Sequence, residues 1–438
     1  MKIGFLLVVF LAFFGIMPAQ ELPRRAVLGF DVASLNSDSE KSAETGVVVK
    51  SLVSPTEAGG IHVGDVVSAV AGQQVSRPEE VLAILRKVRP GEQVSIELRR
   101  NGHPLEVQVS AQPAPYESSP NVDVLYRAVE ANGSLRRVIV TKPKANGVFP
   151  AILLVGGLGC YSVDGLTDKD VPYGQIVYTL TREGYVVMRV EKTGEGDSQG
   201  PPCSAPESDL KIEAAGYAAG LKALRAYDFV DRDRIFILAH SIGPLVAVLV
   251  AQQGGVRGMI AAETIGRAWF DYQIEIARQQ PLDIGEAYDV IERQARRNEV
   301  CLHYFYVEKE TPESLLKRDA GCRDILVPGV PYTYLQQVAD LDLAAQWRKL
   351  DMPVLVIYGT SDGATSADES HYLVSMINSF HPGRATYVEI PGMAHILNTS
   401  PSRGQFLRDH GGPHPQLHPA ILPTLENWLR KQVAVGKG

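Results

Sequence analysis

The sequence predicts an α/β fold in which a mostly parallel sheet is covered by helices and is preceded by a smaller β-rich domain. Two observations lead to this prediction. From about residue 122 onward, continuous apolar runs of strand length alternate with stretches of helical periodicity. Such runs are typical of strands buried on both faces of a parallel sheet. Before residue 110, short strand-like runs are separated by glycine turns around one helical stretch.

Length and composition place the chain among ordinary globular proteins. Its 438 residues allow two or three domains with sizeable cores, and 45% of them are hydrophobic and 21% charged. The formal net charge of -7 is modest for this length. It argues against a surface for nucleic acid or for anionic membranes.

The first residues are expected to form a secretory signal peptide over 1–19. Lys2 precedes an apolar run over 3–17, and Ala19 stands before the polar Gln20. The run is short for a membrane span, so no stable span is expected after cleavage. An uncleaved anchor is the alternative, because Met17 is large for the position three residues before the cut. We therefore expect an exported protein, secreted or periplasmic.

Export makes disulfides the expected state of the four cysteines, Cys160, Cys203, Cys301 and Cys322. Three pairings are possible in principle. Cys160 and Cys203 follow successive predicted strands and should share one sheet edge, whereas Cys301 and Cys322 lie in one insertion. This favours the pairs Cys160 with Cys203 and Cys301 with Cys322; four reduced, buried thiols are the alternative.

Residues 26–110 carry the signals of a compact domain. Strands are predicted at 26–30 and 47–49, and a glycine-rich turn leads into a third strand over 58–67. A helix at 78–88 and two hairpin strands at 94–99 and 105–109 follow. Pro78 suits the first turn of the helix and Pro90-Gly91 ends it. The turn Asn101-Gly102 joins the last two strands.

This segment resembles a PDZ domain of the kind attached to bacterial periplasmic proteases. The triplet Leu28-Gly29-Phe30 matches the carboxylate-binding loop of that family, and residues 58–65 match its turn before the third strand. The resemblance implies that the backbone of Leu28, Gly29 and Phe30 holds the C-terminal carboxylate of an extended peptide. A domain that only braces its neighbour is the alternative. A proline-containing spacer over 111–121 is expected to follow.

Residues 122–434 are expected to form the second domain. It begins with a hairpin of 122–129 and 135–141, which turns at Asn132-Gly133. Buried strands are then predicted at 151–155, 185–190, 234–238, 259–262, 353–358 and 386–390. A long helix is expected over 209–226. Between about 269 and 348 the alternation gives way to a mostly helical insertion, where a cap over a site is expected.

The pentapeptide Ala239-His240-Ser241-Ile242-Gly243 lies between a predicted strand and an apolar helical run over 245–251. A serine at so sharp a strand-to-helix turn exposes its hydroxyl above the sheet edge, and small residues two positions away on either side leave room for the turn. This pattern predicts that Ser241 is a catalytic nucleophile.

A serine hydroxyl needs a base and an orienting acid to act as a nucleophile. Asp362 follows strand 353–358 and is the predicted acid, with Asp368 as the competitor if the loop is longer. His395 follows strand 386–390 in a tight turn and is the predicted base. His240 is expected to pack at the turn rather than to act as the base, because adjacent side chains diverge there.

Two backbone N–H groups are expected to form an oxyanion site. One belongs to Ile242, at the positive end of the helix that follows the serine. The other is assigned to Leu158, with Gly157 as the alternative, in the turn Gly156-Gly157-Leu158-Gly159. No phosphate loop is expected in this turn, because no G-K-[ST] follows it.

These parts together resemble the α/β-hydrolase superfamily over most of the chain from residue 122 onward. The similarity extends to residues 191–198, which are similar to the family's loop after the fourth strand, although Thr193 stands where arginine is common. The chain looks closest to the serine aminopeptidase-like and esterase-like branch. The resemblance implies acyl transfer to water by Ser241, Asp362 and His395, without a metal or an organic cofactor.

Ester hydrolysis of a small acyl substrate is the first expectation, and a peptidase acting on short peptides is the alternative. Asp271 and Glu275 could share one helix face and hold a peptide amino group. Trp269, Phe270 and Tyr272 could line an acyl pocket or pack the cap. A catalytically silent PDZ-hydrolase scaffold is the third hypothesis.

Overall fold

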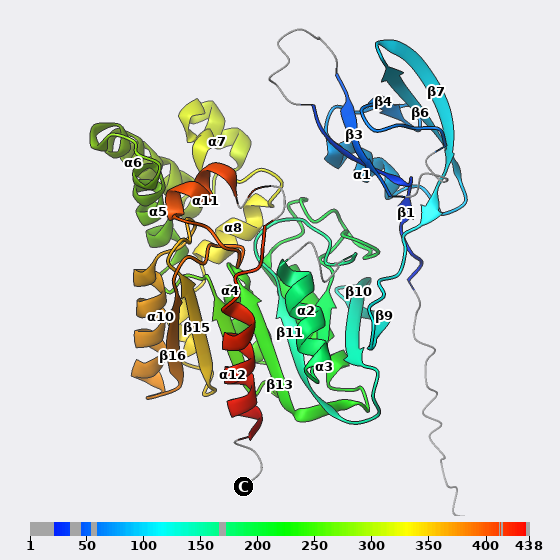
Figure 1. The fold of residues 1–438 in the computed structure, drawn as a ribbon. Coiled ribbons are helices and arrows are strands. Elements are labelled where there is room, and N and C mark those ends of the chain that lie inside the picture. Colours follow the sequence, from blue (N-terminus) through cyan, green and yellow to red (C-terminus); the bar gives the residue numbers. More distant parts are fainter. Residues whose placement is uncertain are drawn as a thin grey trace, which may run out of the picture.

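The computed structural model describes residues 22–35, 45–53, 59–165, 172–410, 412 and 415–434. The expected signal peptide, 1–19, lies outside these residues. Within the described ranges, no helix has the length and apolar character needed to cross a membrane. The chain folds into a small β-rich domain and a larger α/β domain (Figure 1).

The small domain is an antiparallel sheet with the strand order β2-β3-β4-β6-β7, and β5 pairs with β4. The elements are β2 Phe30–Ser34, β3 Val47–Leu52, β4 Val66–Val70, β5 Gln73–Gln74, α1 Pro78–Leu85, β6 Gln93–Arg100 and β7 His103–Ser110. Helix α1 begins at Pro78 as predicted and ends three residues earlier than expected. Val67 and Ile96 are fully buried in the core beneath it.

The first predicted strand is broken in two. Gly29 adopts a left-handed φ of 76° between β1, Ala26–Val27, and β2. Strand β1 pairs with β8, Gln112–Pro113. The segment expected to be a spacer therefore contains a strand, because its backbone pairs with the incoming N-terminal segment.

The large domain is built on an eight-stranded sheet with the order β16-β15-β14-β13-β11-β12-β10-β9. Its strands are β9 Val122–Ala131, β10 Ser134–Pro143, β11 Phe149–Val155, β12 Val186–Val190, β13 Val230–His240, β14 Gly258–Ala262, β15 Val354–Gly359 and β16 Ala385–Ile390. The hairpin β9–β10 is antiparallel to β12, and the strands from β12 to β16 pair in parallel. The predicted mostly parallel sheet is confirmed.

Alternate side chains of each strand enter two separate cores, because successive residues of a strand face opposite sides. In β11, Leu153 faces a core built with α3, Leu210–Leu224, α4, Gly243–Ala251, and α10, Ala367–Phe380. Leu154 faces the other core, built with α2, Pro172–Arg182, and α12, Ile421–Ala434. Helices therefore cover both faces of the sheet (Figure 1).

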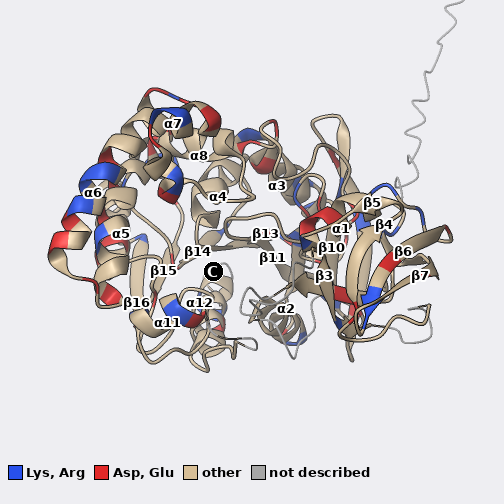
Figure 2. Cartoon of the chain, turned by 90° about the horizontal axis from the view of Figure 1, so that it is seen from above, with Lys and Arg blue, Asp and Glu red and all other residues tan. Residues whose placement is uncertain are grey.

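A mostly helical insertion lies between β14 and β15, as expected. It comprises α5 Trp269–Asp283, α6 Tyr288–Leu302, η1 His303–Val307, α7 Pro312–Arg318, η2 Ala320–Ile325, α8 Tyr332–Ala339 and α9 Leu343–Trp347. Seen from above, charged residues lie along its outer helices α5, α6 and α7, whereas the ribbon around β11, β13 and β14 is almost entirely tan (Figure 2).

Two disulfides tie loops together in the large domain. Cys160 bonds to Cys203 and joins the turn after β11 to the loop after β12, with 5.6 Å between the Cα atoms. Cys301 bonds to Cys322 and joins α6 to η2, with 5.4 Å between the Cα atoms. This is the predicted pairing, which rested on the strand order for Cys160 and Cys203 and on a shared insertion for Cys301 and Cys322.

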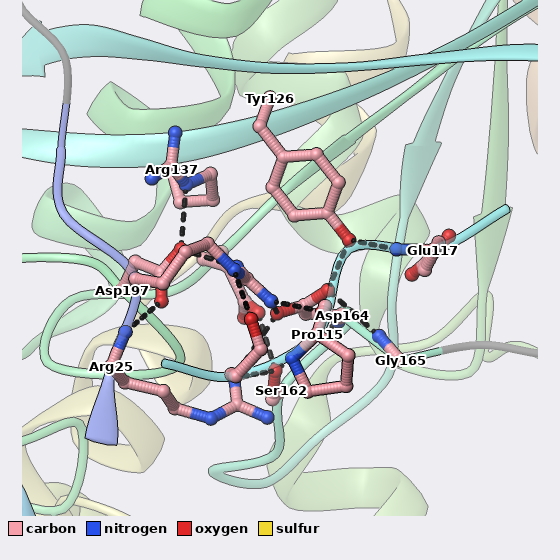
Figure 3. A network of polar contacts seen from close by, with 12 residues as sticks. Arg25, Pro115, Glu117, Tyr126, Arg137, Ser162, Asp164, Gly165 and Asp197 are labelled. Atoms are coloured by element: carbon pink, nitrogen blue, oxygen red, sulfur yellow. Dashed lines mark hydrogen bonds and ion pairs between the residues drawn. The ribbon is translucent and has the colours of Figure 1, made fainter. Parts of the chain in front are cut away.

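The N-terminal segment before β1 is built into the large domain through buried ion pairs (Figure 3). Arg24 donates to Asp164 at 2.6 Å and to Asp197 at 2.5 Å, and the hydroxyl of Tyr126 donates to Asp164 at 2.6 Å. Arg137 contacts the same Asp197 at 2.9 Å. Because both carboxylates lie on loops of the large domain, these bonds fix the chain where it enters the small domain.

Candidate active site

Ser241 lies at the turn between β13 and α4, and its φ of 61° is left-handed. Such backbone strain in a non-glycine residue is typical of a nucleophile turn. Gly243 allows the turn to approach β11, because a Cβ there would stand 2.6 Å from the carbonyl oxygen of Val155. The serine side chain is thereby held at the carboxyl ends of the parallel strands.

His395 reaches Ser241 from the turn after β16. Its Nε2 lies 2.9 Å from Oγ of Ser241. The turn approaches the end of β15 closely, because a Cβ on Gly359 would stand 2.2 Å from the carbonyl oxygen of Met393. This close approach therefore requires glycine at position 359.

Asp362 lies behind His395, in the turn after β15. Its Oδ2 is 3.1 Å from Nδ1 of His395. The other carboxyl oxygen accepts from the backbone N–H groups of Ala364 at 2.6 Å and Thr365 at 3.1 Å. Asp368, the alternative acid, is exposed in the first turn of α10.

The environment of Asp362 favours the carboxylate form. The side chain is fully buried, which alone would raise its pKa. The attraction of His395 and hydrogen bonds from His395, Glu263 and Thr365 outweigh that effect and hold the pKa of Asp362 well below its usual range. A stable negative charge at this position is suited to orienting an imidazole.

His240 contacts the backbone of the turn that carries His395, and not the hydroxyl of Ser241. Its Nε2 lies 2.6 Å from the carbonyl oxygen of His395, and its Nδ1 lies 2.5 Å from the hydroxyl of Tyr173. Burial, assisted by the neighbouring His395, lowers the pKa of His240 to about 3. The neutral ring therefore donates from Nε2 to the carbonyl and accepts from Tyr173.

The glycine turn after β11 lies beside Ser241. A Cβ on Gly157 would stand 3.1 Å from Cβ of Ser241, so the backbone is close to the hydroxyl. Lys192 and Tyr161 both donate to the carbonyl oxygen of Gly157, at 2.9 Å and 3.3 Å. Leu158 and Ile242, the residues expected to supply oxyanion N–H groups, both border the space above the serine.

A cavity of about 480 Å³ opens above Ser241. It is lined by Gly157, Leu158, Tyr161, Pro172, Tyr173, His240, Ser241, Ile242, Ile265, Trp269, Tyr272, Ala364, Thr365, His395, Ile396 and Pro415. Among these described residues there is no lysine, arginine, aspartate or glutamate. The described part of the cavity wall is therefore suited to an uncharged, largely apolar group.

The structure separates the residues that were expected to line this space. Trp269 and Tyr272 line the cavity, whereas Phe270 packs edge-on against Tyr306. Asp271 is exposed, and Glu275 pairs with Arg267 and accepts from Ser366. Neither carboxylate is among the lining residues.

Two functional candidates were missed by sequence reasoning. Lys192 belongs to the loop over 191–198, to which the sequence assigned no role, and Glu263 directly follows strand β14. A charged residue at the carboxyl end of an apolar strand was the only local signal for Glu263.

The small domain presents its predicted carboxylate loop next to an edge strand. Leu28 and Phe30 are buried, and the carbonyl oxygen of Gly29 accepts from Val53 at 2.8 Å. Strand β2 stands at the end of the sheet order. A peptide strand adding to this sheet would pair with such an edge.

Comparisons with known proteins agree with both domains. Residues 26–111 match the family model of the PDZ domain, and residues 160–400 match the model described as serine aminopeptidase, S33. Esterase EstD of Thermotoga maritima is 25% identical over 240 residues, which are 53% of this chain and 52% of the esterase. Zinc metalloprotease RasP of Shouchella clausii is 36% identical over 118 residues, 23% of this chain and 28% of the protease. The chain thus spans about half of the esterase and less of the protease.

Solved structures of low sequence identity were also found. Est1E from Butyrivibrio proteoclasticus with ferulic acid bound is 18% identical, with a TM-score of 0.46 over 70% of this chain and 99% of that chain. Proline iminopeptidase of Mycobacterium smegmatis is 15% identical, with a TM-score of 0.44 over 72% of this chain and all of that chain. Because the serine aminopeptidase model covers more than half of its residues, the chain belongs to the serine aminopeptidase, S33 family, and its α/β-hydrolase domain is preceded by a PDZ domain.

Proposed function

We propose that this protein is a serine hydrolase that cleaves carboxylic esters with Ser241, His395 and Asp362. The observation that carries the proposal is the continuous series of contacts from Oγ of Ser241 to His395, 2.9 Å, and from His395 to Asp362, 3.1 Å. A nucleophile, a base and an orienting acid need this arrangement.

The proposed reaction has two stages. Nε2 of His395 takes the proton of Ser241 as Oγ bonds to the acyl carbon, and the carbonyl oxygen becomes an oxyanion. Backbone N–H groups of Leu158 and Ile242 hold that oxyanion, with Gly157 as the alternative to Leu158. His395 then protonates the departing alkoxide. In the second stage His395 deprotonates a water, which attacks the acyl-enzyme, releases the carboxylate product and restores Ser241.

The described residues that line the cavity carry no Lys, Arg, Asp or Glu, which supports an ester over a peptide with a free amino end. An aminopeptidase site must stabilise an ammonium group, which is costly to bury without a carboxylate partner. The described residues that line the cavity include no carboxylate, and Glu275 is already paired with Arg267. The family's description keeps an aminopeptidase as the second candidate.

We further propose that the protein is exported and acts in a secreted or periplasmic setting. Two disulfides, Cys160–Cys203 and Cys301–Cys322, are compatible with an oxidising compartment. At the PDZ domain, the loop of Leu28, Gly29 and Phe30 is proposed to hold the C-terminus of a peptide that pairs with β2.

Labelling with a fluorophosphonate probe tests the proposed nucleophile. The wild type should label, and Ser241→Ala should not. Ser379→Ala, which removes an exposed serine on α10, is the matched control and should label fully. Panels of uncharged esters and aminoacyl amides then separate the two enzymatic candidates. A folded, disulfide-intact wild type that does not label would favour the catalytically silent scaffold.

A further inference from the structure

Glu263 is a buried acid beside the proposed catalytic residues. It directly follows β14, which lies between β13, the strand that leads to Ser241, and β15, the strand that leads to Asp362. Its side chain is inaccessible to solvent and its φ of 50° is left-handed. The proposed reaction does not use this carboxyl group.

The surroundings of Glu263 do not suit a carboxylate. Within the described chain, neither of its carboxyl oxygens receives a hydrogen bond of good geometry, although the backbone of Gly359 lies close by. The carboxyl lies against the end of β15, since a Cβ on Gly359 would stand 2.7 Å from its Oε1. A buried charge without donors is strongly unfavourable, whereas a carboxylic acid can meet part of its need by donating its own proton.

The charged and titratable groups that face Glu263 are Asp362, Arg403, Tyr358 and Tyr387. Arg403 is the cation among them, but it donates to Asp283 at 2.7 Å, to the hydroxyl of Tyr358 at 3.1 Å and to the carbonyl oxygen of Thr365 at 2.6 Å. Burial, followed by the negative charge of Asp362, raises the pKa of Glu263 well above its usual range, and outweighs the opposing effects of the Gly359 backbone and Arg403. Two carboxyl groups in contact share a hydrogen bond only when one of them holds a proton.

We propose that Glu263 is a positioning residue: it remains a carboxylic acid and donates its proton in a hydrogen bond to Asp362, which in turn orients His395. This inference rests on the proposed function. The bond adds a donor to Asp362 beyond the imidazole of His395, the backbone of residues 364 and 365 and the hydroxyl of Thr365. It does so without placing a second negative charge beside His395.

Two substitutions distinguish this role from packing alone. Glu263→Gln keeps the shape and offers an amide N–H to Asp362, so it should retain kcat within about threefold. Glu263→Ala removes the donor and should lower kcat by about tenfold, because Asp362 then loses one of the bonds that fix its orientation toward His395. Glu369→Gln is the matched control: Glu369 is also a buried acid, but it accepts from the backbone of Gly266 and Arg267.

The pH profile of kcat/KM gives the decisive readout. If Glu263 is neutral, Glu263→Gln changes no charge and the acid limb stays in place. If Glu263 is ionised, the substitution removes a negative charge near the imidazolium of His395. That imidazolium then becomes easier to deprotonate, and the acid limb moves to lower pH. Such a movement, or a loss in Glu263→Gln equal to that in Glu263→Ala, would overturn the proposal.

Infrared spectroscopy tests the protonation of Glu263 independently of turnover. At neutral pH, infrared spectra of the folded wild type should contain a protonated-carboxyl C=O band that is missing in Glu263→Gln. Absence of that difference would contradict a neutral Glu263 whatever the activity shows. A wild type that does not react with the fluorophosphonate probe but shows the band would refute the proposed function alone.

Discussion

Lys192 donates a hydrogen bond from Nζ to the carbonyl oxygen of Gly157 at 2.9 Å, so a buried ammonium group from the loop after β12 holds the turn beside Ser241. The same ammonium lies 3.3 Å from Glu213 on α3. A loop, a helix and the proposed oxyanion turn therefore meet at one side chain.

Lys192→Met should lower kcat by about ten- to hundredfold with a small change in KM, because a displaced turn weakens the hold on the oxyanion more than on the substrate. Steady-state kinetics on an uncharged ester checks this. Lys142→Met is the matched control, since Lys142 pairs with Asp123 on the β9–β10 hairpin. An equal loss in both variants would show that Lys192 has no special role.

Arg24→Ala should destabilise the protein by about 3 kcal/mol or more, because it leaves Asp164 and Asp197 buried with a lost partner. Chemical denaturation measures the free energy of unfolding. The exposed Arg77, paired with Glu80, provides the control, and Arg77→Ala should leave the midpoint almost unchanged. Equal midpoints for the two variants would mean that the N-terminal segment is only loosely held.

Glu191 should make the protein less stable as the pH rises. Burial raises the pKa of Glu191 to about 7 from an ordinary 4.5, against the opposing bonds from Ser162 and Val163. The folded carboxyl thus holds its proton longer than the unfolded one, so the stabilisation is present below pH 4.5 and is lost as the pH passes 7.

Glu191→Gln cannot ionise, so its free energy of unfolding should exceed that of the wild type above neutral pH by up to about 3 kcal/mol, relative to their difference in acid. Denaturation series at several pH values check the slope. Parallel curves for the wild type and the variant would contradict this assignment.

The two disulfides should differ in their effect on activity. Each closes a loop, with a sequence separation of 43 for Cys160 and Cys203 and of 21 for Cys301 and Cys322, so chain entropy predicts a stabilisation of about 3–4 kcal/mol for each. Cys160 directly follows the turn beside Ser241. A double variant in which Cys160 and Cys203 are both replaced by serine should lose both thermal stability and kcat.

The disulfide between Cys301 and Cys322, in the helical insertion, serves as the comparison. Replacement of Cys301 and Cys322 by serine should lower the melting temperature and leave kcat nearly unchanged, since that bond lies within the insertion. Melting curves and ester kinetics on both double variants test the difference. A loss of kcat in the Cys301 and Cys322 variant, without one in the Cys160 and Cys203 variant, would contradict this prediction.

Most of the fold could be predicted because its signals are local. The strand expected at 151–155 is β11, Phe149–Val155, and the helix expected at 209–226 is α3, Leu210–Leu224. Apolar runs and helix-capping residues determine structure through neighbours a few residues away. The side chain of Asp209, for example, accepts from the backbone of Ile212 at 2.9 Å. The boundary between β1 and β2 was missed, because pairing with β8 is a contact between distant segments.

The sequence by itself determined the class of fold, the two domains and the turn at Ser241, because periodicity and turn chemistry are properties of neighbouring residues. Only the tertiary structure decided that Asp362 and not Asp368 faces His395, that Lys192 holds Gly157, and that no charged side chain lines the described cavity. It also decided the placement of Glu263. These are contacts between residues far apart in the chain, and burial and charge pairing exist only after the sheet and its cap have assembled.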